Sequence, residues 1–212
     1  MKPRIAPPDQ QPEHFAFADM AKVKAIIARY PEGRQQSAVM PLLDLVMRQT
    51  AGEAKSGGGW IPEVAMDEIA RILEMPKIKV YEVATFYSMY ILAPVGKHHI
   101  QCCTTTPCWL RGSADIVKAC EEKLGIHMGE TTPDMNFTLS EVECLGACVN
   151  APMVQINDEY YEDLTPARMK EIIDALAAGK DVPKGPQNGR RASMSAAGPT
   201  TLVAEAKKAG VA

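Results

Sequence analysis

Four cysteines in two short pairs are the residues of this chain best suited to chemistry. Cys103 and Cys108 form a C-x4-C pair, and Cys144 and Cys148 form a C-x3-C pair, with 35 residues between the pairs. Thiolates are soft ligands, and two pairs on separate loops can close around one soft metal centre. In a reducing cytosol such pairs favour a metal or redox site over a disulfide framework. The spacing therefore predicts a metal or redox centre.

Three other kinds of site are weighed against this interpretation. A structural zinc site stays open, because zinc ligand spacings extend to C-x4-C although C-x2-C is commoner. A pair of disulfides requires an oxidising compartment, for which the sequence carries no signal. A thiol–disulfide enzyme is disfavoured because the chain contains no C-x-x-C motif.

The two remaining cysteines are predicted to be buried thiols and not ligands. Cys102 precedes Cys103 in a predicted strand, so its side chain points to the opposite face of the sheet. Cys120 lies twelve residues after Cys108 in a predicted helix. At helical rise this separation is about 18 Å, which is too far for one small cluster.

Composition limits the class of protein. The chain has 212 residues, a formal net charge of −3 and 46% apolar residues, which allows one sizeable domain or two small ones. Its mild acidity argues against a nucleic-acid partner, which favours a basic face. Residues 1–20 lack the apolar core of a signal peptide, and the uncharged stretch at residues 83–96 is too short to span a bilayer. These features predict a soluble protein.

Several other groups of residues are predicted to carry no site. His98 and His99 precede the first cysteine pair and are expected to be solvated. The glycine run before Trp60 lacks the Lys-Ser/Thr of a P-loop, so the chain alone is not expected to bind a nucleotide. Arg190 and Arg191 are expected to be a solvated charge pair, unless a partner orders the segment that contains them.

The predicted fold class is α+β: a four-helix bundle followed by a thioredoxin-like domain. Residues 1–18 are proline-rich and are predicted to form an extended arm, and residues 19–93 to form the bundle. Apolar residues recur at helical spacing in four segments, which begin after Asp19, at Val39, near Pro62 and at Pro76. The fourth pattern continues to Ile91. A glycine-rich loop is expected over residues 51–59.

Residues 94–180 show a different pattern, with strands expected at 98–103 and 137–143 and a hairpin at 153–164. A helix is expected from Pro107 or Cys108 to about Leu124, and another from Thr165 to Gly179. The resulting order β-α-β-β-α suits a small α/β domain resembling thioredoxin. Residues 181–212 have no core pattern and are expected to be a disordered tail unless a partner orders them.

The predicted elements place the cysteines where thiolates are favoured. Cys103 ends a strand, and Cys108 lies in the first turn of a helix, where backbone N–H groups and the helix dipole stabilise negative charge. Gly146 permits a positive φ within the second pair, so backbone amides can approach the sulfurs. Pro107 and Pro152 are expected to stiffen the two loops.

Three segments around the cysteines carry a resemblance to a known family. They read Cys-Thr-Thr-Thr-Pro-Cys-Trp-Leu-Arg-Gly at 103–112, Gly-Glu-Thr-Thr at 129–132, and Glu-Cys-Leu-Gly-Ala-Cys-Val-Asn-Ala-Pro at 143–152. This combination resembles the small thioredoxin-like [2Fe–2S] subunit of NADH:quinone oxidoreductase, respiratory complex I. The resemblance runs from about residue 30 to residue 179, and the chain departs from the family pattern at residues 52–59 and at Cys102.

The resemblance implies one [2Fe–2S] cluster with Cys103 and Cys108 on one iron and Cys144 and Cys148 on the other. No side chain would be catalytic, because the chain would carry electrons for the NADH dehydrogenase. The implied partners are the flavoprotein subunit that binds FMN and NADH and the large peripheral-arm iron–sulfur subunit. The implied location is the cytoplasmic side of a bacterial inner membrane, or the mitochondrial matrix side.

Two other kinds of protein are alternatives to the complex I subunit, because they share its cysteine pattern or its set of thiol ligands. One is the equivalent diaphorase subunit of an NAD-dependent hydrogenase or formate dehydrogenase, and the other is a zinc-stabilised interaction module. The tail sequence at residues 185–190 and 198–202 resembles the complex I form and favours it over the hydrogenase and formate dehydrogenase subunits.

Overall fold

The computed structural model describes residues 5–51, 58–195, 197–198 and 201–210. The chain divides into two compact units, one made of Met1–His99 with Thr131–Thr138 and the other of Ile100–Glu130 with Leu139–Ala212. Most of the glycine-rich loop expected at 51–59 lies outside the described residues, as do the first residues of the arm and parts of the tail.

Four α-helices form the core of the first unit. They are α1 (Met20–Ile27), α2 (Val39–Thr50), α3 (Glu63–Ile72) and α4 (Lys77–Phe86). The carboxylate of Asp19 accepts a hydrogen bond from the Lys22 backbone at 2.9 Å, so the predicted N-cap of α1 is confirmed. Leu42, Leu43 and Ile69 are fully buried in one apolar cluster with residues of α1 and α4. Burial of each such side chain contributes about 1.5–3 kcal/mol.

The fourth helix is shorter than predicted. It ends at Phe86, because Tyr87 has an extended backbone with φ −86° and ψ 123°. Tyr90 and Ile91 are buried, as their apolar pattern indicates, but they lie in the segment that follows the helix. The Tyr90 hydroxyl donates to the Met40 carbonyl at 3.1 Å. Tertiary packing therefore buries these residues without helical structure.

Residues 5–18 lie along the same unit. The Ala6 backbone N–H donates to Leu92 at 2.9 Å, and the Gln11 side chain accepts from the Glu63 backbone at 3.0 Å. Gln49 of α2 holds the other end of this segment through hydrogen bonds with Ala16 and Ala18 at 2.9 Å. The only turn of helix here among the described residues is η1 (Pro8–Gln10).

A five-stranded sheet has the order β2-β1-β3-β4-β5. Its strands are β1 (His98–Cys103), β2 (Phe137–Val142), β3 (Val154–Ile156), β4 (Glu159–Glu162) and β5 (Gly185–Pro186). β3 is antiparallel to both β1 and β4, and β4 is parallel to β5. The predicted strands and hairpin are confirmed, and Asn157 turns the hairpin at φ 54°.

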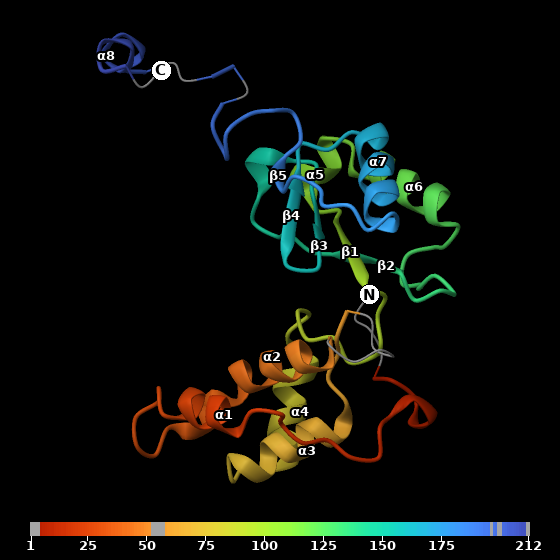
Figure 1. The fold of residues 1–212 in the computed structure, drawn as a ribbon, viewed down its shortest axis with the longest axis vertical. Helices are drawn as coiled ribbons and strands as arrows, with labels where there is room; N and C mark the ends of the chain where they lie inside the picture. The colour runs from red at the N-terminus through yellow and green to blue at the C-terminus, as the bar shows by residue number, and fades with distance from the viewer. Residues whose placement is uncertain (1–4, 52–57, 196, 199–200, 211–212) are drawn as a thin grey trace. The chain divides into compact units, whose positions relative to one another are not determined.

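The second unit contains α5 (Thr106–Leu110), α6 (Ser113–Leu124) and α7 (Pro166–Ala177), besides a short helix near its end. α6 and α7 pack side by side (Figure 1). The single helix expected from residue 107 to 124 is therefore wrong. Gly112 has a left-handed backbone with φ 92°, which ends one helix and begins the next. This break separates Cys108 on α5 from Cys120 on α6.

The prediction of a disordered tail is wrong for the described part of residues 181–195. Val182 is buried, and β5 adds to the sheet edge beside β4. Further on, the side chain of Arg190 is buried in an ion pair with Asp163 and is not solvated. A last short helix, α8 (Val203–Lys208), has no buried residue. Contacts made by the chain itself therefore order residues 182–190.

Candidate metal centre

The first cysteine pair is buried at the junction of a strand and a short helix. Cys103 is the last residue of β1, and Cys108 lies within α5. Both side chains are buried, and their thiols share a hydrogen bond. They pack in a small apolar cluster with Ala151 and Met153. The strand, the loop and the helix together hold the two sulfur atoms away from water.

The second cysteine pair lies on an exposed loop after β2. The Sγ atoms of Cys144 and Cys148 are 3.3 Å apart, and the Gly146 backbone N–H donates to Cys144 Sγ at 3.4 Å. Gly146 has φ 86°, as its place between the two cysteines predicted. The Tyr160 hydroxyl of β4 donates to the Leu145 carbonyl at 2.7 Å. The loop therefore presents two thiols and one amide donor to the same point.

One hydroxyl group connects the two pairs. The Oγ1 atom of Thr105 lies 3.2 Å from Cys103 Sγ, and the same side chain hydrogen-bonds Cys144. Cys148 in turn interacts electrostatically with Cys103 and Cys108. The four predicted cysteines are therefore brought together from two separate loops.

The surroundings shift the pKa values of these thiols in opposite directions. The pKa of Cys108 is raised to about 12, first by burial and then by its hydrogen bond with Cys103. The pKa of Cys144 is lowered, mainly by the Gly146 backbone N–H, whereas that of Cys148 is raised by its hydrogen bond with Cys144. A coordinating metal cation deprotonates its thiol ligands outright. Metal binding would therefore release the protons that these thiols carry.

Cys102 and Cys120 are buried, as predicted. Their thiols share a hydrogen bond, which together with burial raises the pKa of Cys102 well above its usual value. The argument from strand alternation holds for Cys102, because Cys102 and Cys103 are neighbours in β1 and their side chains point to opposite faces of the sheet. The argument for Cys120 was the rise of one continuous helix from Cys108, and it does not hold because no continuous helix links the two residues. Cys120 is removed from the site by packing against the opposite side of the strand.

The prediction that His98 and His99 are solvated is wrong. His99 is buried, and burial lowers its pKa to about 4. The ring of His98 lies against Phe137 with a centroid distance of 5.2 Å, and its Nε2 atom is buried without a hydrogen-bond partner among the described residues. Burial also lowers the pKa of His98. Both imidazoles therefore belong to the packed interior around β1.

The donor set fits an iron–sulfur cluster. Four cysteines are the usual ligands of a [2Fe–2S] cluster, and amide or hydroxyl donors to the sulfurs accompany them. Thr105 and Gly146 supply such donors here. In the described part of the chain, no three His, Cys, Asp or Glu side chains are grouped as they would be around a single metal ion.

The thioredoxin-like [2Fe-2S] ferredoxin family model matches residues 23–177. The chain belongs to this family. Its fold is accordingly a mixture of helices and sheet with a thioredoxin-like [2Fe–2S] ferredoxin domain, so the predicted α+β class is confirmed at this level.

Curated relatives in the family are similar over most of their length. The chain is 58% identical over 165 residues to an NADH-quinone oxidoreductase subunit of Rickettsia bellii, covering 77% of this chain and 95% of that protein. It is 48% identical over 195 residues to NADH dehydrogenase [ubiquinone] flavoprotein 2, mitochondrial, of Dictyostelium discoideum, covering 92% of this chain and 76% of the relative. The resemblance inferred from the cysteine segments is thus confirmed.

A solved structure shows the same fold at low identity. A chain of an NAD+-reducing [NiFe]-hydrogenase in its H2-reduced state aligns with a TM-score of 0.54 and 20% identity, covering 67% of this chain and 23% of the hydrogenase chain. Of the helices that the structure describes in this ferredoxin, none combines the length and the apolar character needed to cross a bilayer.

Sequence reasoning missed three residues at the site. Thr105 and Tyr160 carry no spacing signal, because their roles depend on which backbone and sulfur atoms the fold brings near them. Arg190 is a charged residue in the tail. Its burial could not be inferred, because the tail has no apolar pattern that would predict packing against the domain. The acidic residue that pairs with it is 27 positions away in the sequence.

Proposed function

We propose that this protein is the one-electron-transfer subunit of an NADH:quinone oxidoreductase, with a [2Fe–2S] cluster bound by Cys103, Cys108, Cys144 and Cys148. The observation that carries the proposal is the convergence of these four thiols, linked through the Thr105 hydroxyl, in a chain of the thioredoxin-like [2Fe-2S] ferredoxin family. The high identity to NADH-quinone oxidoreductase subunits supports the assignment to this enzyme.

The two pairs suit the two irons of such a cluster, Cys103 and Cys108 on one and Cys144 and Cys148 on the other. When bound, the cluster accepts and passes on one electron at a time. The residues of the chain set the conditions for that exchange. Burial of Cys103 and Cys108 excludes water, and the Gly146 N–H and Thr105 hydroxyl stabilise negative charge on sulfur.

The partners of this proposal are the flavoprotein subunit that holds FMN and NADH and the large peripheral-arm iron–sulfur subunit. Trp109 and Leu110 follow Cys108 directly and are 63% and 71% exposed, and Val149 follows Cys148 and is 65% exposed. Large apolar side chains beside a redox site are typical of a surface that a partner covers. This surface suits the flavoprotein subunit, because electrons from FMN must reach the cluster here.

In the same proposal α1 to α4 form a four-helix bundle that docks the second partner. Ile78, Phe86 and Met89 expose 61%, 73% and 52% of their area on and beside α4. Their exposure contrasts with the buried residues on the opposite face of the helix, Val80 and Ala84. The complex would place this subunit on the cytoplasmic side of a bacterial inner membrane, or on the matrix side in mitochondria.

The diaphorase unit of an NAD-dependent hydrogenase is the second candidate, because a hydrogenase chain shares the fold. Its 20% identity supports the fold alone, whereas the oxidoreductase subunit of Rickettsia bellii is 58% identical. Purification of the native complex separates the two candidates. Co-purification with quinone-reducing activity supports the first, and co-purification with hydrogenase or formate dehydrogenase activity supports the second.

The cluster itself is tested on anaerobically purified protein. We expect a brown protein with two irons and two sulfides and an S = 1/2 EPR signal after reduction. A colourless protein with one zinc would instead support the zinc-stabilised module. Serine substitution of Cys108 or Cys144 is expected to remove or distort the cluster, whereas the matched controls Cys102→Ser and Cys120→Ser should retain iron. The reverse pattern would show that the ligand set is wrong.

A further inference from the structure

A buried ion pair joins the tail to the end of β4. The Nε and Nη2 atoms of Arg190 each donate to a carboxylate oxygen of Asp163 at 2.6 Å. Both side chains are only 9% exposed. Such a two-pronged contact fixes the orientation of the guanidinium group as well as its position. The tail is therefore attached at a defined point rather than by loose charge attraction.

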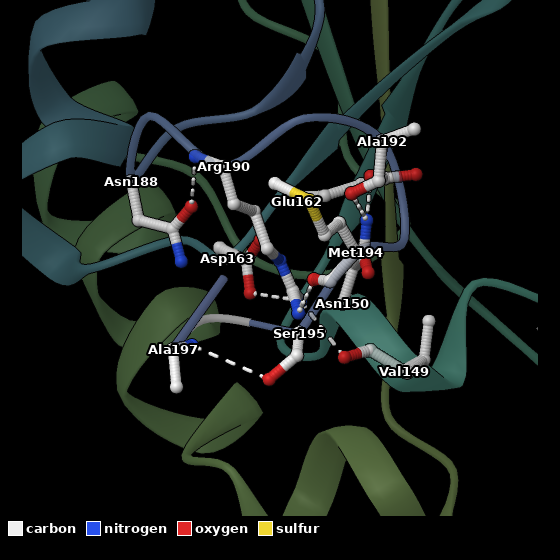
Figure 2. A network of polar contacts seen from close by, with 10 residues as sticks. All are labelled: Val149, Asn150, Glu162, Asp163, Asn188, Arg190, Ala192, Met194, Ser195 and Ala197. Atoms are coloured by element: carbon white, nitrogen blue, oxygen red, sulfur yellow. Dashed lines mark hydrogen bonds and ion pairs between the residues drawn. The ribbon is translucent and has the colours of Figure 1, made fainter. Parts of the chain in front are cut away.

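The same guanidinium group holds the second cysteine loop. Nη2 of Arg190 donates to the Val149 carbonyl at 2.8 Å, and Nη1 donates to the Met194 carbonyl at 3.2 Å. Figure 2 shows the guanidinium group between the Asp163 carboxylate and the Val149 carbonyl. Val149 follows Cys148 within the short helix η3 (Cys148–Asn150). Arg190 thus binds the backbone one residue beyond a cysteine of the site.

A second set of contacts ties η3 to the same two segments. The Asp163 backbone N–H donates to the Asn150 carbonyl at 2.8 Å. The Asn150 side-chain amide donates to the Glu162 carboxylate and, at 3.2 Å, to the Ala192 carbonyl (Figure 2). Asn150 is itself buried. Both the end of β4 and the tail therefore restrain the helix that begins at Cys148.

A side chain from outside the cysteine loop holds each end of the loop, and the two side chains come from different segments. Tyr160 of β4 binds the carbonyl of Leu145, next to Cys144, and Arg190 of the tail binds the carbonyl of Val149, next to Cys148. Cys144 and Cys148 are exposed, and Leu145 and Ala147 between them are only partly buried against the cluster around Cys103 and Cys108. The geometry of the loop consequently depends on these outside donors.

We propose that Arg190 is a positioning residue for the metal centre: through Asp163 and Val149, the tail clamps η3 and holds Cys148 in place. This inference rests on the proposed function, in which Cys148 is a cluster ligand. Partners of ligand-bearing segments orient the ligands and tune the metal. A lysine would keep the charge but lose the fork that binds Asp163 and Val149 together.

The test compares Arg190→Gln and Arg190→Lys with the wild-type protein. The matched control is Arg71→Gln, because Arg71 makes the same two-pronged contact to Glu68 at 2.7 Å, on α3 in the other unit and in an exposed position. Asp163→Asn removes the other half of the clamp, and asparagine tolerates the positive φ of 52° at this position. Circular dichroism confirms folding of each variant.

Two measurements report on the clamp. The first is the rate at which a chelator removes iron from the folded holoprotein, with the EPR g-values of the reduced cluster. We expect Arg190→Gln and Asp163→Asn to release iron about tenfold faster and to shift the g-values, Arg190→Lys to fall between, and Arg71→Gln to match the wild type. The second is amide hydrogen exchange over residues 145–151 of the folded protein as purified, which we expect to accelerate in the same order.

The outcomes separate the inference from the function on which it rests. Unchanged exchange at residues 145–151 together with unchanged iron release in folded Arg190→Gln would overturn the clamp. Loss of iron in Arg71→Gln to the same extent would also overturn it, since the effect would then be general destabilisation. If the wild-type protein carried no cluster, the proposed function would fail, while faster exchange in Arg190→Gln would still support the structural clamp.

Discussion

The hydroxyl oxygen of Thr105 lies 3.2 Å from the Sγ atom of Cys103. The same hydroxyl also hydrogen-bonds Cys144 on the other loop. It therefore contacts a sulfur atom from each cysteine pair. Hydrogen bonds to sulfur favour the more negative, reduced form of a cluster and so raise its reduction potential.

Thr105→Val is expected to lower the reduction potential of the cluster. The change removes a donor worth about 0.5–1.5 kcal/mol, which corresponds to roughly 20–60 mV for a one-electron couple. Valine suits the extended backbone of Thr105, at φ −69° and ψ 167°, so the fold should be kept. EPR-monitored redox titration measures the shift. Thr106→Val is the control, because Thr106 is exposed; an equal shift in both variants would contradict the role of Thr105.

Stability is expected to fall as pH is lowered from 6.5 towards 4, and His99 is one cause. Burial lowers the pKa of His99 to about 4 in the folded protein, against about 6.5 in an unfolded chain. Between these values the unfolded chain binds a proton that the folded protein excludes. The contribution of His99 to the free energy of unfolding is therefore fully present above pH 6.5, and roughly 3 kcal/mol of that free energy is lost by pH 4.

Urea unfolding at pH 7 and pH 5 measures this effect. His99→Gln should show a smaller loss of unfolding free energy between the two pH values than the wild type, because glutamine does not titrate. His127→Gln is the matched control, since the His127 side chain is 82% exposed. A pH dependence that is unchanged in His99→Gln would contradict the assignment.

Gly112→Ala is expected to destabilise the protein and disturb the metal centre. A Cβ atom at this position would meet only Asp115 Oδ2, at 3.6 Å, so the cost of about 1–2 kcal/mol comes from the positive φ of 92°. Relief of that strain would displace α5 and, with it, Cys108. EPR of the reduced protein and thermal unfolding measure the two effects.

The control for this variant is Gly125→Ala at the other end of α6. Gly125 has φ 68° with nothing within 4 Å of an added Cβ, so it carries a similar backbone strain away from the cysteines. We expect a comparable loss of stability with an unchanged EPR spectrum. Identical EPR spectra for both variants and the wild type would show that the break at Gly112 does not position Cys108.

Leu42→Ala is expected to cost about 2–5 kcal/mol of unfolding free energy, because it leaves a cavity in the core of α1 to α4. Leu42 is fully buried there. Ile78→Ala on α4 should change the unfolding free energy by less than about 0.5 kcal/mol, since Ile78 is 61% exposed. Chemical denaturation followed by circular dichroism measures both. A similar cost for the two variants would contradict the assigned core.

Elements with a strong local signal could be predicted from the sequence. β1 extends from His98 to Cys103 as its pattern indicated, and Thr165 caps α7 through a hydrogen bond to the Arg168 backbone at 3.2 Å. Boundaries that depend on one backbone angle could not be predicted. The left-handed conformation of Gly112 divides one apolar pattern into two helices, and the extended conformation of Tyr87 ends α4 early.

The candidate site shows the same division. Residue type and spacing predict the four cysteines as ligands, and they correctly indicated the positive φ of Gly146, because ligand chemistry and glycine geometry are local properties. The burial of His99, the hydrogen bond between Cys102 and Cys120, and the bridge made by Thr105 are not local. Only the tertiary structure shows them, because each depends on residues far apart in the sequence.

The tail illustrates the physical reason most clearly. Residues 181–195 lack an apolar pattern, and sequence reasoning therefore predicts disorder. Besides the buried Val182 and the pairing of β5 with β4, polar contacts order this segment: Arg190 binds Asp163, 27 residues earlier, and the Val149 carbonyl, 41 residues earlier. Such contacts have no periodicity. The sequence therefore predicts the cysteines as ligands from their type and spacing, while only the tertiary structure shows which groups hold the segments that carry them.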